Sequence, residues 1–151
     1  MPPAYSEKIV ATLAAAADLT IATNREDGYP QATTVSFVND GVAIYFGTSA
    51  NSQKARNLAR DARVSLTVNP IYKSWADIKG LSIGGRAVRV HDASELTRVF
   101  DLMVEKFPQI TQYVNPQSGE DLAVFRIDPE IVSILDYSKG FGHIDQVQMA
   151  R

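Results

Sequence analysis

The strongest constraint on the fold is a series of short β-branched or alternating runs that Asp-Gly pairs separate, with no helix between them. These runs predict strands over residues 19–23, 32–38 and 42–46. Asp27-Gly28 and Asp40-Gly41 lie between them, and Asp-Gly tolerates the positive φ that tight hairpin turns need. The first three strands are therefore predicted to form an antiparallel meander.

One helix is predicted before this region, one directly after it and one further along the chain. Ser6 is placed to cap a first helix, and Ser52 to cap a short helix that ends at Asp61. Asp92 and Glu95 have the spacing of a capping box, and Pro108 ends the helix that follows them. The apolar residues predicted to face inward from these helices are Ile9, Val10, Leu13, Ala14, Ala17, Ala55, Leu58, Ala59, Leu96, Val99, Phe100, Met103 and Phe107.

The second half of the chain continues the strand pattern. Gly84-Gly85 interrupts a long apolar run, where a bulge or barrel corner is expected. Asp128-Pro129 divides two last strands, and residues 115–121 are predicted to form a loop. The predicted strands here are residues 64–68, 81–90, 122–127 and 131–137. Because strands and helices do not alternate, the fold class is α+β, an antiparallel barrel of six to seven strands with appended helices.

Composition excludes several classes of function. The 151 residues match the size of one compact domain, so residues 1–151 are predicted to be a single domain. A net charge of -2 offers no general attraction to polyanions, and no nucleic-acid partner is expected. The chain has no cysteine, which removes disulfides, thiolate nucleophiles and thiolate metal sites. Any redox chemistry must therefore come from a bound cofactor.

Neither export nor a membrane is indicated. Residues 1–17 lack the basic flank and long apolar core of a signal peptide. The chain also lacks a run of about eighteen apolar residues, so it is predicted to be cytoplasmic with no membrane partner. The two histidines, His91 and His143, form no metal motif without cysteine, and no metal site is predicted. A surface or capping role is expected for His91, and His143 is expected to lie in a solvated loop.

The start of the helix at residue 52 has the composition of a phosphate site. It follows a strand that ends in Gly47-Thr48-Ser49, and it carries Ser52, Gln53 and Lys54. Free backbone N–H groups, the positive end of the helix dipole, hydroxyls and an ammonium would converge there. The alternative interpretation is that Ser52 only caps a surface helix and that Lys54 is solvated.

A longer motif surrounds this helix start. Its landmarks, in order, are Ala22-Thr23, Asp27-Gly28-Tyr29-Pro30, residues 32–37, Asp40-Gly41, residues 45–48, Ser52, Lys54, Arg56-Asn57-Leu58 and residues 63–68. This order resembles that of flavin-binding split barrels in the pyridoxamine 5'-phosphate oxidase-like superfamily. A weaker likeness continues in Gly85-Arg86-Ala87-Val88.

The resemblance implies a split β-barrel with an FMN site. The residues implied to contact the isoalloxazine ring are Thr33, Thr34, Val35 and Ser36. The residues implied to hold the ribityl phosphate are Thr48, Ser49, Gln53 and Lys54. It also implies a homodimer with each flavin at the subunit interface, and Tyr72 and Trp75 are the candidates for the partner chain's contribution.

The resemblance does not extend to every residue of pyridoxamine 5'-phosphate oxidase itself. That enzyme carries an arginine where this chain has Thr33, and an Arg-Lys pair where this chain has Gln53-Lys54. Its C-terminal Arg and His, which bind the substrate phosphate, have no counterpart in the tail from Tyr137 to His143. These departures argue against the vitamin B6 reaction.

The main functional hypothesis is an FMN-dependent oxidoreductase that acts on an unknown small molecule, with no catalytic side chain assigned. One alternative is a reductase that uses the deazaflavin F420, with Arg56, Arg60 and Lys73 near its polyglutamate tail. A second alternative, from another class, is a non-catalytic stress-response protein that binds flavin or haem.

Overall fold

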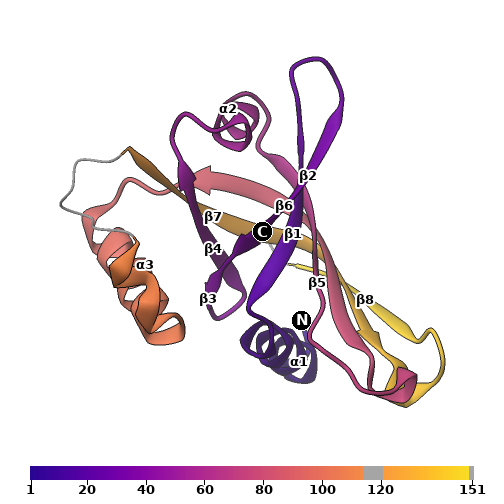
Figure 1. The fold of residues 1–151 in the computed structure, drawn as a ribbon. Coiled ribbons are helices and arrows are strands. Elements are labelled where there is room, and N and C mark those ends of the chain that lie inside the picture. The colour runs from indigo at the N-terminus through magenta and orange to yellow at the C-terminus, as the bar shows by residue number, and fades with distance from the viewer. Residues whose placement is uncertain (114–120, 150–151) are drawn as a thin grey trace.

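The computed structural model describes residues 1–113 and 121–149, which form one curled antiparallel sheet with helices around it (Figure 1). The strands are β1 Asp18–Asn24, β2 Pro30–Ser36, β3 Val38–Asp40, β4 Ala43–Ser49, β5 Arg63–Val68, β6 Lys79–Arg89, β7 Leu122–Asp136 and β8 Ile144–Gln148. The helices are α1 Pro3–Ala15, α2 Gln53–Arg60 and α3 Ala93–Lys106, with 3-10 turns η1 Trp75–Asp77, η2 Pro108–Gln112 and η3 Tyr137–Lys139. The strand order is β2-β1-β5-β6-β7-β4-β3, and β8 pairs with β7. The predicted α+β split barrel with appended helices is confirmed.

The barrel closes at a single buried residue, Phe37. β2 and β3 stand at opposite ends of the strand order, yet only Phe37 separates them in the sequence. The sheet must therefore curl until its two ends meet at Phe37, whose side chain is fully buried. The single strand predicted over residues 32–38 is wrong for this reason. The β1–β2 hairpin of the predicted meander exists. The second predicted pairing, between β2 and β4, is wrong, because β4 pairs with β3 and β7.

The two longest strands, β6 and β7, are fitted together by a bulge at Gly84 and Gly85. A Cβ atom on Gly85 would lie 2.5 Å from the carbonyl oxygen of Asp128, so only glycine permits this approach. Pro129 lies opposite Gly85, at the irregularity where a residue without an N–H is tolerated. The predicted bulge is confirmed. The two strands predicted on either side of Asp128-Pro129 are wrong, because they form one strand.

Two of the three predicted helix caps are confirmed. The Ser52 hydroxyl accepts a hydrogen bond from the Ala55 amide at 3.1 Å, and the Asp92 carboxylate accepts one from the Glu95 amide at 2.9 Å. Ser6 is not a cap. Instead α1 begins at Pro3, because proline fixes the φ that a first helical turn needs, and the Ser6 hydroxyl donates to the Pro3 carbonyl.

The main core lies inside the curl of the sheet, with α1 and α2 packed against it. Ile9, Leu13, Ala55, Leu58 and Val99 are buried as predicted, whereas Ala14, Ala17 and Ala59 are exposed. β8 was not predicted, because its alternation is polar and its pairing with β7 follows a turn through two positive-φ glycines, Gly140 and Gly142. Residues 115–120 of the predicted loop lie outside the described residues. No helix in the described part of the chain is long and apolar enough to span a membrane.

Candidate cofactor site

The hydroxyl groups at the end of β4 hold the turn into α2. Thr48 Oγ1 donates to Ser52 Oγ at 3.0 Å, while Ser52 Oγ also caps the helix. Ser49 Oγ accepts a hydrogen bond from the Asn51 amide at 3.3 Å. These two residues of the predicted phosphate set are thus at the expected place, and each hydroxyl already has a partner within the protein.

Gln53 belongs to a polar network that joins α2 to β1 and β2. Its amide nitrogen donates to Asn57 Oδ1 at 2.8 Å, and its amide oxygen accepts from Arg56 at 2.9 Å. Asn57 is almost fully buried, and its amide donates to Thr23 Oγ1 at 3.0 Å and to Gln31 Oε1 at 3.2 Å. The network fixes the position of α2 relative to β2. It also occupies the Gln53 side chain, which the sequence had suggested for phosphate.

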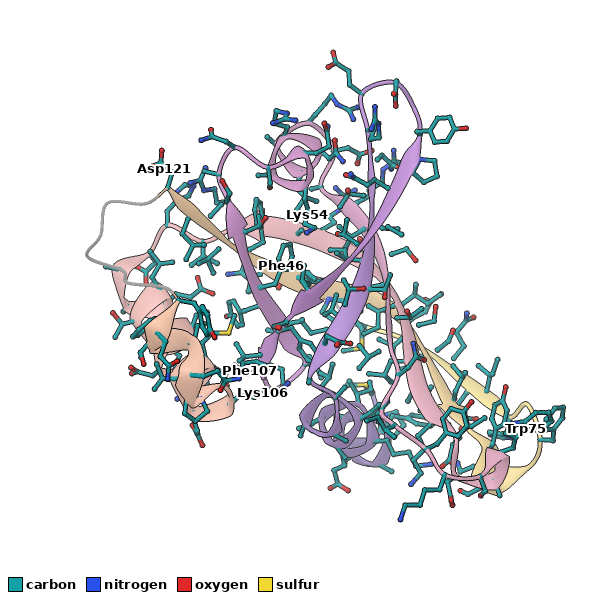
Figure 2. All side chains as sticks on the ribbon, viewed as in Figure 1. Phe46, Lys54, Trp75, Lys106, Phe107 and Asp121 are labelled. Atoms are coloured by element: carbon teal, nitrogen blue, oxygen red, sulfur yellow. The ribbon has the colours of Figure 1, made fainter. Side chains whose placement is uncertain are left out.

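Lys54 differs from Arg56 and Arg60 on the same helix because its ammonium has neither a hydrogen bond nor an ion pair among the described residues. Figure 2 shows Lys54 beneath α2, where it is directed towards Phe46. Its ammonium lies 6.0 Å from the centre of the Phe46 ring, and no carboxylate of the described residues pairs with it. The side chain is half-buried, and this burial lowers the pKa of the Lys54 ammonium. The Lys54 side chain is therefore only partly solvated, and its contact with a phosphate stays a prediction.

The four predicted ring contacts on β2 do not share one face. Thr33 and Val35 are half-buried, whereas Thr34 and Ser36 are exposed, as the alternation of a strand requires. Thr33 Oγ1 is buried and has no hydrogen-bond partner within the described residues. A buried polar atom without a partner is uncommon in a native protein. The Thr33 hydroxyl is therefore a polar group on β2 that the described residues leave unsatisfied.

A cavity of about 470 Å³ borders this strand on the outer side of the sheet. β2 contributes Val35 and Ser36, β4 contributes Gly47, and β7 contributes Leu122 and Val124. The apolar face of α3 and the turn η2 form the opposite wall. No pattern in the sequence indicated this cavity, because α3 meets β4 and β7 only in the folded chain.

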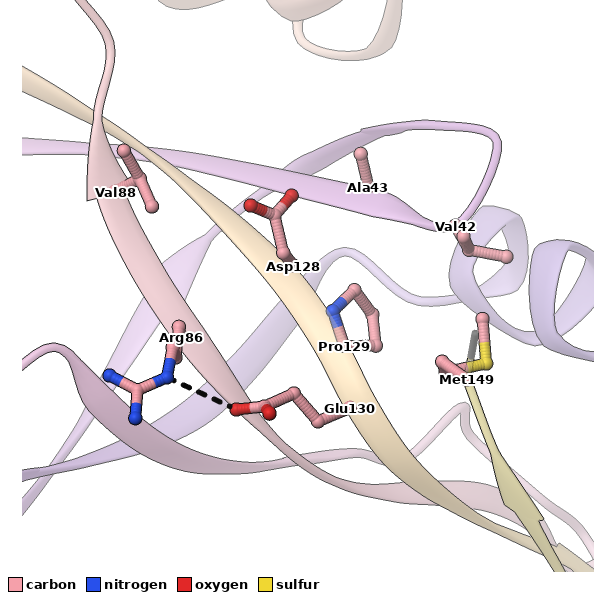
Figure 3. A pocket seen from close by; sticks show the side chains of 8 residues that line it. All are labelled: Val42, Ala43, Arg86, Val88, Asp128, Pro129, Glu130 and Met149. Carbon is pink, nitrogen blue, oxygen red and sulfur yellow. Dashed lines mark ion pairs between the residues drawn. The ribbon is translucent and has the colours of Figure 1, made fainter. Parts of the chain in front are cut away.

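A second hollow, of about 540 Å³, lies on β6 and β7 near the bulge (Figure 3). Val42, Ala43, Val88, Pro129 and Met149 give it an apolar floor, and an ion pair between Arg86 and Glu130 crosses its edge at 3.5 Å. None of the predicted cofactor residues lines it. It is therefore separate from the candidate site.

Trp75 lies far from Lys54 within one chain (Figure 2). Trp75 is 66% exposed at the tip of the β6–β7 extension, where its ring lies 5.9 Å from that of Phe141. Tyr72 is 50% exposed in the preceding irregular segment. If Trp75 contacts a cofactor near Lys54, it must do so from a second copy of the chain.

The cations considered for other cofactors have separate roles. Arg56 donates to the Asn51 carbonyl and to Gln53, and Arg60 donates to the Asn24 carbonyl at 2.6 Å. Lys73 is exposed. His143 lies 3.1 Å from Asp145, and His91 is exposed after β6. No cluster of three or more His, Cys, Asp or Glu residues in the described chain could hold a metal ion.

Sequence reasoning missed two groups near the site. Lys106, at the end of α3, buries its ammonium 3.9 Å from the Phe37 ring, and this nitrogen has no hydrogen-bond partner in the described chain. Glu95 accepts hydrogen bonds from Tyr45 at 2.8 Å and Arg126 at 2.9 Å, which ties α3 to β4 and β7. Burial and the Glu95 carboxylate together raise the pKa of Tyr45 to about 12. The sequence showed the capping box and the apolar spacing of α3, but not these contacts of its side chains with the sheet.

The described residues fit a flavin mononucleotide in charge and in polarity. Lys54 and the first amides of α2, which have no partner within a helix, offer positive charge and donors to a phosphate. Thr33 offers an unpaired hydroxyl from the neighbouring strand. Because Asn57 joins these two elements, both groups are held in place before any ligand binds.

Comparison with known proteins agrees with this fold. The heme binding protein from Mycobacterium smegmatis has a TM-score of 0.81 and 21% identity over 98% of this chain and 59% of its own, so this chain spans 59% of that relative. The conserved hypothetical protein Rv2991 from Mycobacterium tuberculosis has a TM-score of 0.76 and 27% identity over 96% of this chain and 91% of its own. The heme storage protein HutZ from Vibrio cholerae has a TM-score of 0.65 and 26% identity over 85% of this chain and 89% of its own.

The sequence itself gives the family. No curated protein sequence matches the chain. Residues 5–136, however, match the family model of pyridoxamine 5'-phosphate oxidase, and this range covers most of α1 and the sheet through β7. Because this match spans most of the chain and the curled antiparallel sheet agrees with it, the chain belongs to the pyridoxamine 5'-phosphate oxidase family.

Proposed function

We propose that this chain binds FMN between β2 and the start of α2 and acts as an FMN-dependent oxidoreductase on a small molecule. The observation that carries the proposal is the half-buried Lys54 ammonium, which lacks a carboxylate partner among the described residues. A folded protein gains little from an unpaired, desolvated charge unless a ligand completes it. A phosphate monoester is the ligand that suits an ammonium beside a helix start.

The residues of the chain would divide the work of holding the cofactor. Lys54 and the amides of Gln53 and Lys54 would bind the phosphate, with Thr48 and Ser49 shaping the turn beside it. Thr33, Thr34, Val35 and Ser36 would support the ring through the backbone and the inward side chains of β2. FMN, when bound, supplies the hydride or electron chemistry. The protein's part is to orient the ring and exclude water.

The proposal includes a homodimer in which Tyr72 and Trp75 of one chain approach the flavin of the other. Support comes from the exposed rings of Trp75 and Phe141, which lie 5.9 Å apart, and from the exposure of Tyr72 in the preceding segment. Exposed aromatic clusters of this kind are enriched at protein interfaces. Light scattering should give twice the mass of one chain, and a strict monomer that binds FMN tightly would remove both residues from the site. We further propose that residues 1–151 form one domain and that the protein is cytoplasmic.

A non-catalytic haem-binding protein is the second candidate. Similarity to the heme binding protein of M. smegmatis and to HutZ favours it. The cavity beside β2 includes Met103 and Tyr113, two residue types that can ligate haem iron, but it includes no histidine among its described residues. The F420 alternative has weaker support, because Arg56 and Arg60 already donate to backbone carbonyls.

Spectroscopic titration of the purified protein separates these candidates. FMN, F420 and hemin are each added to ligand-free protein, and difference spectra and flavin fluorescence give the affinity. The proposal predicts saturable FMN binding in the micromolar range or tighter, followed by reduction of bound FMN in a steady-state assay with NADH or NADPH. Tight hemin binding with no measurable FMN binding would overturn it. FMN binding without turnover would leave the cofactor assignment standing and remove the enzymatic one.

A further inference from the structure

The cavity between α3 and the outer faces of β4 and β7 has the size and the lining of a small-molecule site. Its volume, about 470 Å³, falls within the usual range for such sites, roughly 300–1,000 Å³. At one edge it reaches Val35 and Ser36, which the proposed function assigns to the flavin ring. We infer that this cavity binds a neutral, apolar or aromatic molecule, and that this is the substrate class of the proposed flavin site. That this molecule is the substrate rests on the proposed function, whereas the class of ligand rests on the cavity alone.

The lining determines the class of ligand. Leu96, Phe100 and Met103 of α3 face Leu122 and Val124 of β7 across the cavity. The polar groups are limited to Ser36, Gln109 and Tyr113, and no charged side chain of the described residues lines it. A charged ligand would lose its hydration there without gaining a counter-charge, which is costly. A neutral ring system with one or two hydrogen-bonding atoms would lose little hydration free energy on entering the cavity.

The cavity is held open by the fold. The ion pair of Glu95 with Arg126 and the hydrogen bond from Tyr45 fasten the first turn of α3 to the sheet. Val99 is buried in the same contact. The first turns of α3 are therefore docked on the sheet, and the cavity lies beside this contact, between the apolar face of the helix and the strands.

Gly47 keeps the floor of the cavity empty although nothing local demands a glycine. A Cβ atom at this position would lie 3.6 Å from Leu122 Cδ1, which is ordinary van der Waals contact. The backbone of Gly47 does not have positive φ. A larger residue could therefore fold at this position, and its side chain would occupy the cavity.

Two fluorescent probes that differ in charge test the ligand class on the full-length, flavin-free protein. N-phenylnaphthylamine is neutral, and anilinonaphthalene sulfonate has the same rings with an added sulfonate. We expect saturable binding of the neutral probe and binding of the sulfonate that is weaker by about tenfold or more, because burying an unpaired charge is unfavourable. Equal affinities for the two probes, or no saturable binding of the neutral one, would overturn the inference.

Cavity-filling variants locate the probe. Gly47→Val fills the floor from β4, and Met103→Phe fills the opposite wall from α3, so one variant remains informative if the other does not fold. Each should weaken the neutral probe by about tenfold. Val88→Phe is the matched control, because Val88 is a 43% exposed strand residue that lines only the other hollow. Loss of binding in Val88→Phe but not in the two cavity variants would refute this location.

Riboflavin binding to the same variants separates this inference from the proposed function. If the parent protein binds neither FMN nor riboflavin but shows the expected probe pattern, the cavity stands as an apolar site and the oxidoreductase proposal fails. If FMN binds and the neutral probe does not, the cavity inference fails alone. If Met103→Phe loses riboflavin as strongly as the probe, the cavity is the ring site itself and not a separate substrate site.

Discussion

Replacement of Lys54 tests the proposed phosphate contact most directly. An ammonium and a phosphate oxygen about 4 Å apart, in an effective dielectric of about 20, attract by about 4 kcal/mol per pair of unit charges. Desolvation of the phosphate offsets part of this gain. The Lys54 ammonium is already half-buried in the ligand-free protein, so much of its own desolvation cost belongs to folding. A net contribution of about 1.5–3 kcal/mol follows, which is typical for hydrogen bonds to charged groups.

Lys54→Met is the variant of choice because methionine keeps an apolar stem near Phe46 and removes the charge. FMN should bind this variant roughly tenfold to 150-fold more weakly than the parent. Riboflavin, which has the same ring and ribityl chain but no phosphate, should bind both proteins equally. Isothermal titration calorimetry with the two ligands gives the comparison. The free energy of unfolding of the ligand-free protein should not fall, because the variant removes a charge that is desolvated and unpaired in the folded state.

Lys79→Ala supplies the matched control for loss of a positive charge. Lys79 is an exposed lysine at the start of β6, at the other end of the molecule from α2 (Figure 1). It should leave FMN affinity unchanged, because exposed charges so far apart are screened by salt. Equal losses of FMN and riboflavin in Lys54→Met would indicate a disturbed pocket. Unchanged affinity for both ligands would refute the contact.

Two further predictions concern the scaffold around the site. Gly85→Ala should lower the free energy of unfolding by about 1–3 kcal/mol, because the added Cβ would lie 2.5 Å from the Asp128 carbonyl oxygen. Gly84→Ala is the control and should lower it less, because its Cβ would meet only the Ile131 side chain. Urea unfolding of both variants measures the difference. Tyr45→Phe should cost about 1 kcal/mol at neutral pH. The Tyr45 hydroxyl and Arg126 lower the pKa of the Glu95 carboxyl, so this stabilisation is present above the pKa of an unfolded Glu and lost as pH falls through the folded value. The gap between Tyr45→Phe and the parent should therefore narrow in acid, and a constant gap would contradict the reasoning.

Local features of this fold could be predicted from sequence, and long-range pairing could not. Ser52 and Asp92 cap helices because a cap depends on a few neighbouring residues. The bulge at Gly84 and Gly85 was visible for the same reason. The break at Phe37 was not, because it arises from closure of the whole sheet, which joins β2 and β3 from opposite ends. The fusion of two predicted strands into β7 depends likewise on the partner strand β6.

The candidate site shows the same limit at the level of single side chains. The pattern placed Thr48, Ser49, Gln53 and Lys54 near one helix start, and the structure brings them there. It could not reveal which of them are already occupied by partners. Their partners, Ser52, Asn51 and Asn57, are near in the sequence, but which side chains pair is settled only when the turn and the helix have formed. The bond from Asn57 to Gln31 depends further on the approach of α2 to β2. The assignment of these residues to FMN stays a prediction.

Hydrogen bonds that these side chains already make within the protein change how tightly the site can bind a ligand. If every polar group at the start of α2 were free, a phosphate would have to order several side chains on binding, and each would cost conformational entropy. Instead Thr48, Ser49 and Gln53 are ordered by contacts within the protein. Lys54 on α2 and Thr33 on β2 are left with unsatisfied groups. Because Asn57 bonds to residues that fix both elements, a ligand that bridged them, as we propose for FMN, would meet a preorganised pair of donors and would gain affinity from few contacts.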